Sequence, residues 1–235
     1  MPTQDAEFDV FAEDYGKLVD QSIKISGESS QYFANARIEC LRRMLDQYKI
    51  SARKVLDFGC GIGLAAPLLL RGLGAHHVHG VDVSSRSIDV ARRNNTGPQF
   101  GFSNLREFVP DGSYDVVYCS GVFHHIPLGE RRAAIECVFR SLRPGGHFAL
   151  WEHNPSNLGT RWAVASCVFD VGVILLRPID AERLLKGGGL EILSTRHHFI
   201  FPKSLSRLRW TEQWFVRLPI GAQYQVLGRK RLTQK

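Results

Sequence analysis

The stretch VLDFGCGIG, residues 55–63, decides the fold prediction, because a short apolar run ends there in three closely spaced glycines. The run KVLDFG (54–59) is typical of a buried strand, and the pattern that follows it is helical. Gly59, Gly61 and Gly63 therefore occupy the turn, where glycine lets the backbone bend tightly and approach a ligand. Free N–H groups at the start of the following helix attract an anion. We predict a nucleotide-type binding loop at this strand end.

Two acidic residues accompany the loop. Asp57 comes directly before it, and Asp82 closes the next predicted strand in GVDVS (80–84). An acidic residue at the second strand end can accept hydrogen bonds from both ribose hydroxyls. A tight turn without a ligand would not require Asp82, so the pair favours a nucleoside-containing ligand.

A nicotinamide dinucleotide is the main alternative ligand. Counted from Gly59, the GxGxxG pattern fails because Leu64 occupies the third glycine position; counted from Gly61, GIGLAA fits GxGxxA. The apolar run ends at Phe58, which favours Gly59 as the first glycine. Asp57 in the turn also favours a cationic amino acid moiety over a pyrophosphate.

Strand and helix patterns alternate along the rest of the chain. Further strands are predicted at residues 77–83, 98–103, 114–120, 147–152, 190–201 and 223–229. Helices are predicted at residues 62–72, 85–94, 127–142 and 178–187, after an opening helix through Phe8, Phe11 and Tyr15 and a second one from Phe33 to Tyr48. This alternation predicts an α/β, doubly wound sheet of mainly parallel strands.

Four motifs together resemble the class I family of S-adenosylmethionine (SAM)-dependent methyltransferases. They are VLDFGCGIG (55–63), GVDVSSRSI (80–88), YDVVYCSGVFHHI (114–126) and LRPGGHFALWE (142–152). The chain is most similar to the ubiquinone/menaquinone-biosynthesis-like small-molecule methyltransferases. The resemblance implies a Rossmann-like seven-stranded sheet of order 3-2-1-4-5-7-6 with an antiparallel last strand, N-terminal helices, and a helical insert before the last strand.

The resemblance also implies that the cofactor is SAM. Gly59, Cys60 and Gly61 would then line its methionine part, whose ammonium Asp57 would face. Asp82 would hold the ribose hydroxyls.

The remaining implied contacts come from later strand ends and from the opening helix. Val83 would lie against the adenine, and Ser103 and Asn104 near its amino group, where many relatives carry an acidic residue. Cys119 would supply backbone near the sulfonium. Tyr15 would close the cofactor site.

The size of the chain and its cysteines set limits on its class. With 235 residues and 44% hydrophobic content, it can bury one core, so we predict a single domain over residues 1–235. Residues 1–50 would form cap helices, residues 51–155 the SAM-binding core, and residues 156–235 the last strands and a substrate-side insert. Five cysteines without a CxxC pair indicate neither a disulfide framework nor a zinc site.

We expect a cytoplasmic location, because the sequence shows neither a secretory signal nor a stretch that could span a membrane. The N-terminus lacks the apolar core of a secretory signal. The longest apolar stretch, residues 163–176, is interrupted by Asp170 and is too short to span a membrane.

Catalytic candidates are expected at the ends of the fourth and fifth strands, beside the ligand crevice. Methyl transfer is an in-line displacement that the protein aligns, and a base is needed only where the acceptor holds a tightly bound proton. His124 and Glu152 are the candidates, with structural packing as the alternative for each. No metal site is predicted, because the adjacent His124 and His125 lack the i, i+4 spacing of a helical zinc pair.

The acceptor is expected to be a small molecule, apolar or lipid-like as in quinone or natural-product biosynthesis. Residues 180–235 hold eleven Lys/Arg and four Asp/Glu, which accounts for the whole net charge of +7. This surplus suggests either an anionic partner or a solvated basic face. An RNA methyltransferase is the alternative function. It is disfavoured because SGVFHHIP (120–127) stands where many base N-methyltransferases carry an NPPY-like signature. We expect no DNA partner.

The segment KSLSRLRWTEQWFVRL (203–218) is the most unusual part of the sequence. Its leucines and phenylalanine approximate one helical face, next to Trp210 and Trp214. A basic amphipathic helix of this kind can lie on a membrane surface. We favour the alternative, a helix that packs on the sheet and caps the substrate pocket.

Overall fold

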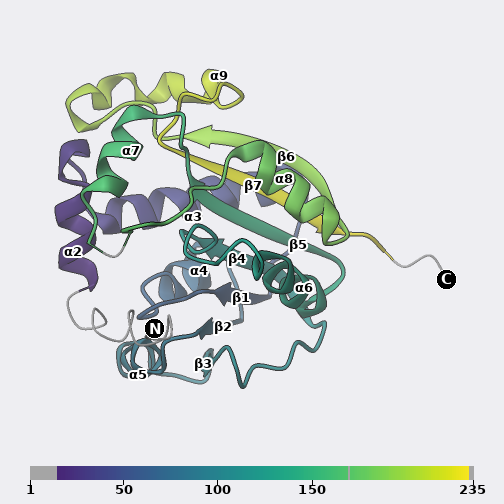
Figure 1. Cartoon of the computed structure of the whole chain (residues 1–235). Helices are drawn as coiled ribbons and strands as arrows, with labels where there is room; N and C mark the ends of the chain where they lie inside the picture. The colour runs from purple at the N-terminus through teal and green to yellow at the C-terminus, as the bar shows by residue number, and fades with distance from the viewer. Residues whose placement is uncertain (1–14, 169, 233–235) are drawn as a thin grey trace.

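The computed structural model describes residues 15–168 and 170–232, without the side chains of Tyr15 and Lys17. Phe8 and Phe11 of the expected opening helix lie outside the described residues. A central sheet crosses the molecule, and α2 (Tyr15–Ser22), α7 (Leu158–Ala165) and α9 (Glu212–Phe215) gather at one end of it (Figure 1). This end carries the candidate site described below.

The sheet has seven strands in the order β3-β2-β1-β4-β5-β7-β6. The strands are β1 (Lys54–Phe58), β2 (His77–Asp82), β3 (Phe100–Asn104), β4 (Tyr114–Ser120), β5 (Leu142–His153), β6 (Leu190–His198) and β7 (Gln223–Lys230). The first five run parallel, and β7 is antiparallel to both β5 and β6. The predicted order and the antiparallel last strand are confirmed.

The other helical segments connect these strands or precede them. They are η1 (Lys24–Ser26), α3 (Ser30–Gln47), α4 (Ala66–Gly72), α5 (Ser85–Asn94), α6 (Arg131–Ser141), α8 (Pro178–Gly187) and the 3₁₀ segment η2 (Lys203–Thr211). Side chains cap several helix starts: Ser29 accepts a hydrogen bond from Tyr32 N, and Asn157 one from Thr160 N. Such caps satisfy N–H groups that the helix itself leaves open.

The core has two layers because side chains alternate across each strand. Val55 of β1 belongs to one layer, with α3, α4 and α5 packed over it. The next residue, Leu56, belongs to the other, with α6 and α8 packed over it. The sheet is therefore covered on both faces, as a doubly wound architecture requires.

Three local predictions differ from the structure. The helix expected from residue 62 begins at Ala66, because Gly63 has a left-handed φ of 76° and prolongs the turn. The sequence RPGG (143–146) is expected to end a helix, but it lies within β5, which starts at Leu142. The pairing of β5 with β4 is irregular near Tyr114.

The insert at residues 203–218 also differs from the single amphipathic helix that its pattern suggests. It forms 3₁₀ turns with a kink at Leu205, followed by the short α9. The carboxylate of Glu212 accepts hydrogen bonds from Ile200 N and Phe201 N, so the insert folds back onto the end of β6. Within the described residues, no helix has the length and apolar character needed to cross a membrane.

Candidate functional site

A cleft opens where β1, β2 and β4 end, and it encloses about 870 Å³ that is partly open to solvent. Its walls come from the turn after each of these strands. The lining residues are Phe58, Gly59, Gly61, Ile62, Asp82, Val83, Ser87, Leu105, Ser120, Gly121, Val122, His125 and Ile126. Ligands of open α/β sheets bind at this kind of position.

The glycine loop is held tightly on one side and is open on the other. The N–H groups of Gly59 and Cys60 both donate to Val81 O, at 2.8 and 3.0 Å. A Cβ on Gly59 would lie 2.4 Å from a methyl of Val122, whereas one on Gly61 would meet no atom of the described residues within 4 Å. Within the described part of the chain, Gly61 therefore faces open space, where a ligand can approach the backbone.

Asp82 joins the two loops that form this cleft. Its Oδ2 accepts a hydrogen bond from Gly61 N at 2.7 Å, and its Oδ1 accepts one from Ser84 N at 3.0 Å. A carboxylate can accept more than one hydrogen bond at each oxygen. Asp82 is thus fixed by the chain while it still lines the cleft.

Asp57 is buried under the loop, and its Oδ2 accepts no hydrogen bond from the described part of the chain. Burial, with a smaller contribution from the negative Asp82, raises the pKa of the Asp57 carboxyl to about 7. A buried acceptor without a donor is rare in proteins and costly. The site therefore provides an unsatisfied carboxylate that a cationic ligand group would stabilise.

The other predicted cofactor residues lie in or beside the cleft wall. Val83 lines it, while Ser103 Oγ is 2.8 Å from His79 Nε2. The Asn104 amide donates to Val83 O at 2.9 Å and so shapes the adjoining turn. Cys119 is fully buried one residue before the lining residue Ser120.

The last two predicted contacts are those of Cys60 and Tyr15. Cys60 is buried in the core layer behind the loop. The predicted contact of the Tyr15 side chain lies outside the described residues.

A second cavity, called the chamber below, continues from the cleft. It shares Ser120, Gly121 and His125 with the cleft. Its other lining residues are Val19, Ser22, Ile23, Ser30, Phe33, Arg37, His124, His153, Ala163, Val164, Cys167, Asp170 and Gln223. Titratable side chains are therefore concentrated where the cleft meets the chamber.

His124 is fixed from behind by Glu152. Its Nδ1 lies 2.7 Å from Glu152 Oε2, and the other carboxylate oxygen accepts hydrogen bonds from Val122 N and Phe123 N. Burial opposes a charge on His124, but Glu152 and Asp170 outweigh it and raise the pKa of this imidazole to about 9. Glu152 is buried and reaches the chamber only through His124.

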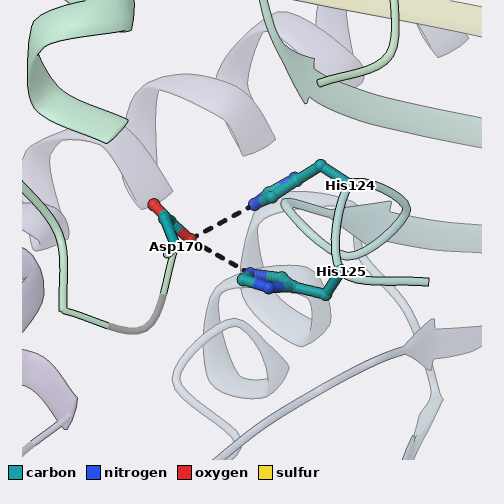
Figure 2. A group of neighbouring side chains, drawn as sticks. All are labelled: His124, His125 and Asp170. Atoms are coloured by element: carbon teal, nitrogen blue, oxygen red, sulfur yellow. Dashed lines mark ion pairs between the residues drawn. The ribbon is translucent and has the colours of Figure 1, made fainter. Parts of the chain in front are cut away.

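Asp170 lies between the two adjacent histidines (Figure 2). Its Oδ1 is 3.2 Å from His125 Nε2 and 3.6 Å from His124 Nε2. The two histidine rings are tilted by 41° with their centroids 4.1 Å apart, and the centroid of the His153 ring lies 5.0 Å from that of His124. Burial and the neighbouring His124 lower the pKa of His125 to about 4.

An apolar pocket, called the outer pocket below, extends the chamber away from the cleft. It shares Ile23, Phe33, His153, Ala163 and Gln223 with the chamber and encloses about 1010 Å³ that is partly open to solvent. Its other lining residues are Ile25, Ser26, Glu28, Tyr32, Asn157, Gly159, Thr160, Phe199, Ile200, Phe201, Pro202, Arg209 and Ala222. Cleft, chamber and outer pocket are therefore adjacent in that order, since each shares lining residues with the next.

The sequence interpretation missed several lining residues. Arg37 and Asp170 line the chamber, but Arg37 belongs to a helix recognised only by its apolar face, and Asp170 lies between predicted elements. Ser120 and Gly121 had a usable signal, since Ser120 ends the predicted fourth strand and Gly121 directly follows it.

Comparison with known sequences places residues 55–146 in a family described as a methyltransferase domain. The chain is 31% identical over 160 residues to a phthiotriol/phenolphthiotriol dimycocerosates methyltransferase of Mycobacterium leprae, a match covering 67% of this chain and 58% of that protein. It is 25% identical to a ubiquinone biosynthesis O-methyltransferase of Marinobacter nauticus, over 63% of this chain and 67% of that protein. The chain spans only about half to two thirds of the curated relatives it matches.

The fold is shared with solved structures of low sequence identity. A SAM-dependent methyltransferase from Thermotoga maritima superimposes with a TM-score of 0.66 at 16% identity, covering 97% of this chain and all of the other. At this identity, the likeness concerns the fold alone.

Proposed function

Because the chain belongs to the class I family of SAM-dependent methyltransferases, we propose that it transfers a methyl group from SAM to a small, largely apolar acceptor. Members of the family use SAM as the methyl donor. The observation that carries the proposal is the adjacency of cleft, chamber and outer pocket, which share lining residues. Two ligands in neighbouring cavities can meet end to end, which an in-line displacement requires.

Two features of the glycine loop and the strand before it support SAM. Asp57, next to the lining residue Phe58, presents a buried oxygen without a donor from the described chain, which suits the methionine ammonium. Among the described residues, none occupies the space that a Cβ on Gly61 would fill, which suits a closely approaching methionine carboxylate at the backbone. Asp82 and Val83 line the cleft where the ribose and adenine would lie.

When bound, SAM supplies a methyl group on a positively charged sulfur, and the carbon–sulfur bond breaks with its electron pair left on sulfur. The residues of this chain align the acceptor, whose lone pair forms the new bond to the methyl carbon. Ser120, Gly121 and His125 line both cleft and chamber, so the transfer would take place beside them.

Side chains of the chamber orient the reacting end of the acceptor in this proposal. Arg37 Nε is buried without a partner in the described chain and can donate to an acceptor oxygen. His124 lines the chamber beside the place of the acceptor, and Glu152 is a positioning residue that holds the His124 ring by its Nδ1.

The outer pocket supports an apolar acceptor. Its walls include Phe33, Phe199 and Ile200, and its main charged pair, Glu28 with Arg209, is already joined at 2.9 Å. The names of matched relatives refer to phthiotriol dimycocerosates, trans-aconitate and ubiquinone biosynthesis. An acceptor with an apolar body and an oxygen at one end fits the pocket and chamber best.

Contact with an anionic membrane surface would deliver such an acceptor. Trp210 and Trp214 are 65% and 63% exposed, and the basic Lys203, Arg207 and Arg217 on the same segment are exposed as well. Exposed tryptophans together with basic residues are typical of interfacial binding. This segment follows directly on Phe201 and Pro202, which line the outer pocket.

Sedimentation with phosphatidylglycerol vesicles tests the membrane contact. We expect salt-sensitive binding that is lost in the Trp210→Ser/Trp214→Ser double variant and kept in Val109→Ser, a matched change at a distant exposed apolar residue. Equal binding by all three proteins, or no binding by the wild type, would contradict the membrane proposal and leave methyl transfer untouched.

Calorimetric titration with SAM, its demethylated product and NADH tests the methyltransferase proposal. We expect SAM and product to bind, and Asp82→Ala to abolish that binding, because it removes both the ribose contact and the hydrogen bonds to Gly61 and Ser84. Binding of NADH alone would refute the proposal. An acceptor screen with methyl-labelled SAM would follow. Ala163 lines both the chamber and the outer pocket, so Ala163→Phe should narrow the passage between them. We expect this variant to keep SAM binding and to lose turnover of the acceptor.

A further inference from the structure

The histidine pair and Asp170 have a geometry that direct hydrogen bonding does not explain. Asp170 Oδ1 is buried within 3.6 Å of two imidazole nitrogens, yet it makes no well-aligned hydrogen bond within the described chain. One ring nitrogen of each histidine and one carboxylate oxygen of Asp170 all lie within 4.8 Å of one another. Three ligand-type atoms thus face a common point (Figure 2).

The separations match those around a single metal ion. Nitrogen and oxygen ligands lie about 2.0–2.2 Å from a tetrahedral zinc ion, so two of them are about 3.3 Å apart. The two measured distances from Asp170 Oδ1, 3.2 and 3.6 Å, fall on either side of that value.

The contact behind His124 is also one that metal-binding histidines require. A ligating imidazole almost always donates its other ring N–H to a carboxylate or carbonyl, which fixes its orientation. Glu152 Oε2 lies 2.7 Å from His124 Nδ1, which leaves Nε2 directed toward Asp170. Glu152 is itself held by two backbone N–H groups, so this contact is rigid.

We propose that His124, His125 and Asp170 bind a divalent transition-metal ion at the wall of the chamber. Two imidazoles and one carboxylate suit Zn²⁺, Fe²⁺ or Mn²⁺ better than the oxygen-preferring Ca²⁺ and Mg²⁺. The three ligands leave a coordination position that faces the chamber, because all three residues line it. The helical spacing rule for zinc pairs does not apply here, since the third ligand comes from a distant segment.

The position of the ion implies a role that rests on the proposed methyl transfer. An acceptor hydroxyl bound at the open position would lose its proton to solvent, because a bound cation stabilises the resulting oxyanion. The oxygen lone pair then forms the bond to the methyl carbon, while the electron pair of the broken carbon–sulfur bond stays on sulfur. The metal would thus activate an oxygen acceptor rather than a carbon acceptor.

Metal binding is tested on the full chain without SAM or acceptor, so the result is independent of the methyl-transfer proposal. After treatment with a chelator, the protein is titrated with Zn²⁺ by calorimetry and with Co²⁺ by visible absorption. We expect one ion per chain and the strong absorption bands of Co²⁺ with nitrogen and oxygen ligands in a low-symmetry site.

Two ligand variants and one matched control complete the test. Asp170→Asn and His125→Gln should weaken Zn²⁺ binding by more than about 100-fold, since even changes behind a ligand cost about 10–100-fold. His147→Gln, a buried histidine of β5 outside the cluster, should bind Zn²⁺ as the wild type does. Thermal unfolding of each variant shows whether it is folded.

Absence of stoichiometric binding in the folded wild type, or unchanged binding in Asp170→Asn, would overturn the proposal. His124 or His125 would then act on the acceptor as an imidazole without a metal. A titration of the wild type and Asp170→Asn with SAM separates this outcome from failure of the cofactor proposal, because Asp170 lines the chamber and is not among the residues that line the cleft.

Discussion

Replacing Asp57 by asparagine should stabilise the protein at the expense of cofactor binding. Asp57 is buried, and its pKa is raised from 3.8 in an unfolded chain to about 7 in the folded one. The folded state therefore binds the proton more tightly than the unfolded state does. The free energy of unfolding must fall as pH rises from about 4 to about 7, and the loss is complete above pH 7.

The size of the effect follows from the two pKa values. At about 1.4 kcal/mol for each pKa unit, the ionisable Asp57 destabilises the folded protein by about 2 kcal/mol at pH 5 and about 4 kcal/mol at pH 8. Asp57→Asn carries no titratable group there. Its advantage over the wild type should therefore grow by about 2–3 kcal/mol between pH 5 and pH 8.

Urea denaturation of both proteins at several pH values measures this difference, because titrations common to both cancel. Asp89→Asn, a change at an exposed carboxylate of α5, is the control and should follow the wild type. Parallel pH profiles for the wild type and Asp57→Asn would refute the reasoning about burial.

Cofactor binding should change in the opposite direction. The SAM ammonium pairs with the ionised carboxylate, so wild-type affinity should fall about fivefold from pH 7 to pH 6 as Asp57 takes up a proton. Asp57→Asn should bind SAM weakly at both pH values. Tight binding by this variant would show that Asp57 does not contact the ligand.

Three further predictions concern the loops around the site. Gly61→Ala should lose SAM affinity in calorimetry, with only about 1 kcal/mol of destabilisation from its left-handed φ. Gly59→Ala also clashes with the Val122 side chain, so thermal unfolding should show a much larger drop in melting temperature. Equal effects of the two variants in both assays would contradict the assignment of Gly61 to the open side of the loop. Tyr224→Phe removes the hydroxyl that donates to Leu176 O at 2.7 Å. Urea denaturation should therefore show that the free energy of unfolding falls by about 1–2 kcal/mol. A fall smaller than the error of the measurement would contradict this prediction. Asn154→Ala removes the amide that donates to Pro219 O and Gly221 O, just before β7. The free energy of unfolding, measured with urea, should fall by about 2–3 kcal/mol. No change would show that water replaces the amide.

Much of the fold could be predicted from local sequence patterns. The apolar runs at 54–59 and 114–120 became β1 and β4, the central strands, because strands buried on both faces have continuous apolar sequences. The order of the last two strands came only from the family resemblance. Helix starts were less accurate: a glycine in a left-handed conformation, such as Gly63, prolongs a turn where composition alone still suggests a helix.

The cofactor side of the site was more predictable than the acceptor side for a physical reason. Gly59, Gly61 and Asp82 belong to turns that directly follow strands, so sequence position alone brings them together at one sheet edge. The outer pocket instead joins η1, α3, α7 and the residues after β6, which are far apart in the sequence. Their contact depends on packing angles that no local pattern contains.

Asp170 shows how one residue can be misinterpreted from sequence for the same reason. In the sequence it only interrupts an apolar stretch, which argued against a membrane span. In the structure, its segment is anchored from two distant elements: the Arg131 guanidinium donates to Ile174 O at 2.8 Å, and the Tyr224 hydroxyl donates to Leu176 O at 2.7 Å. These anchors hold a charged side chain inside the chamber despite the cost of its burial. A buried carboxylate fixed in this way requires a cationic partner: protonated His124 supplies one when the site holds no metal, and in the proposal above an ion bound by Asp170 and the two histidines takes over that role.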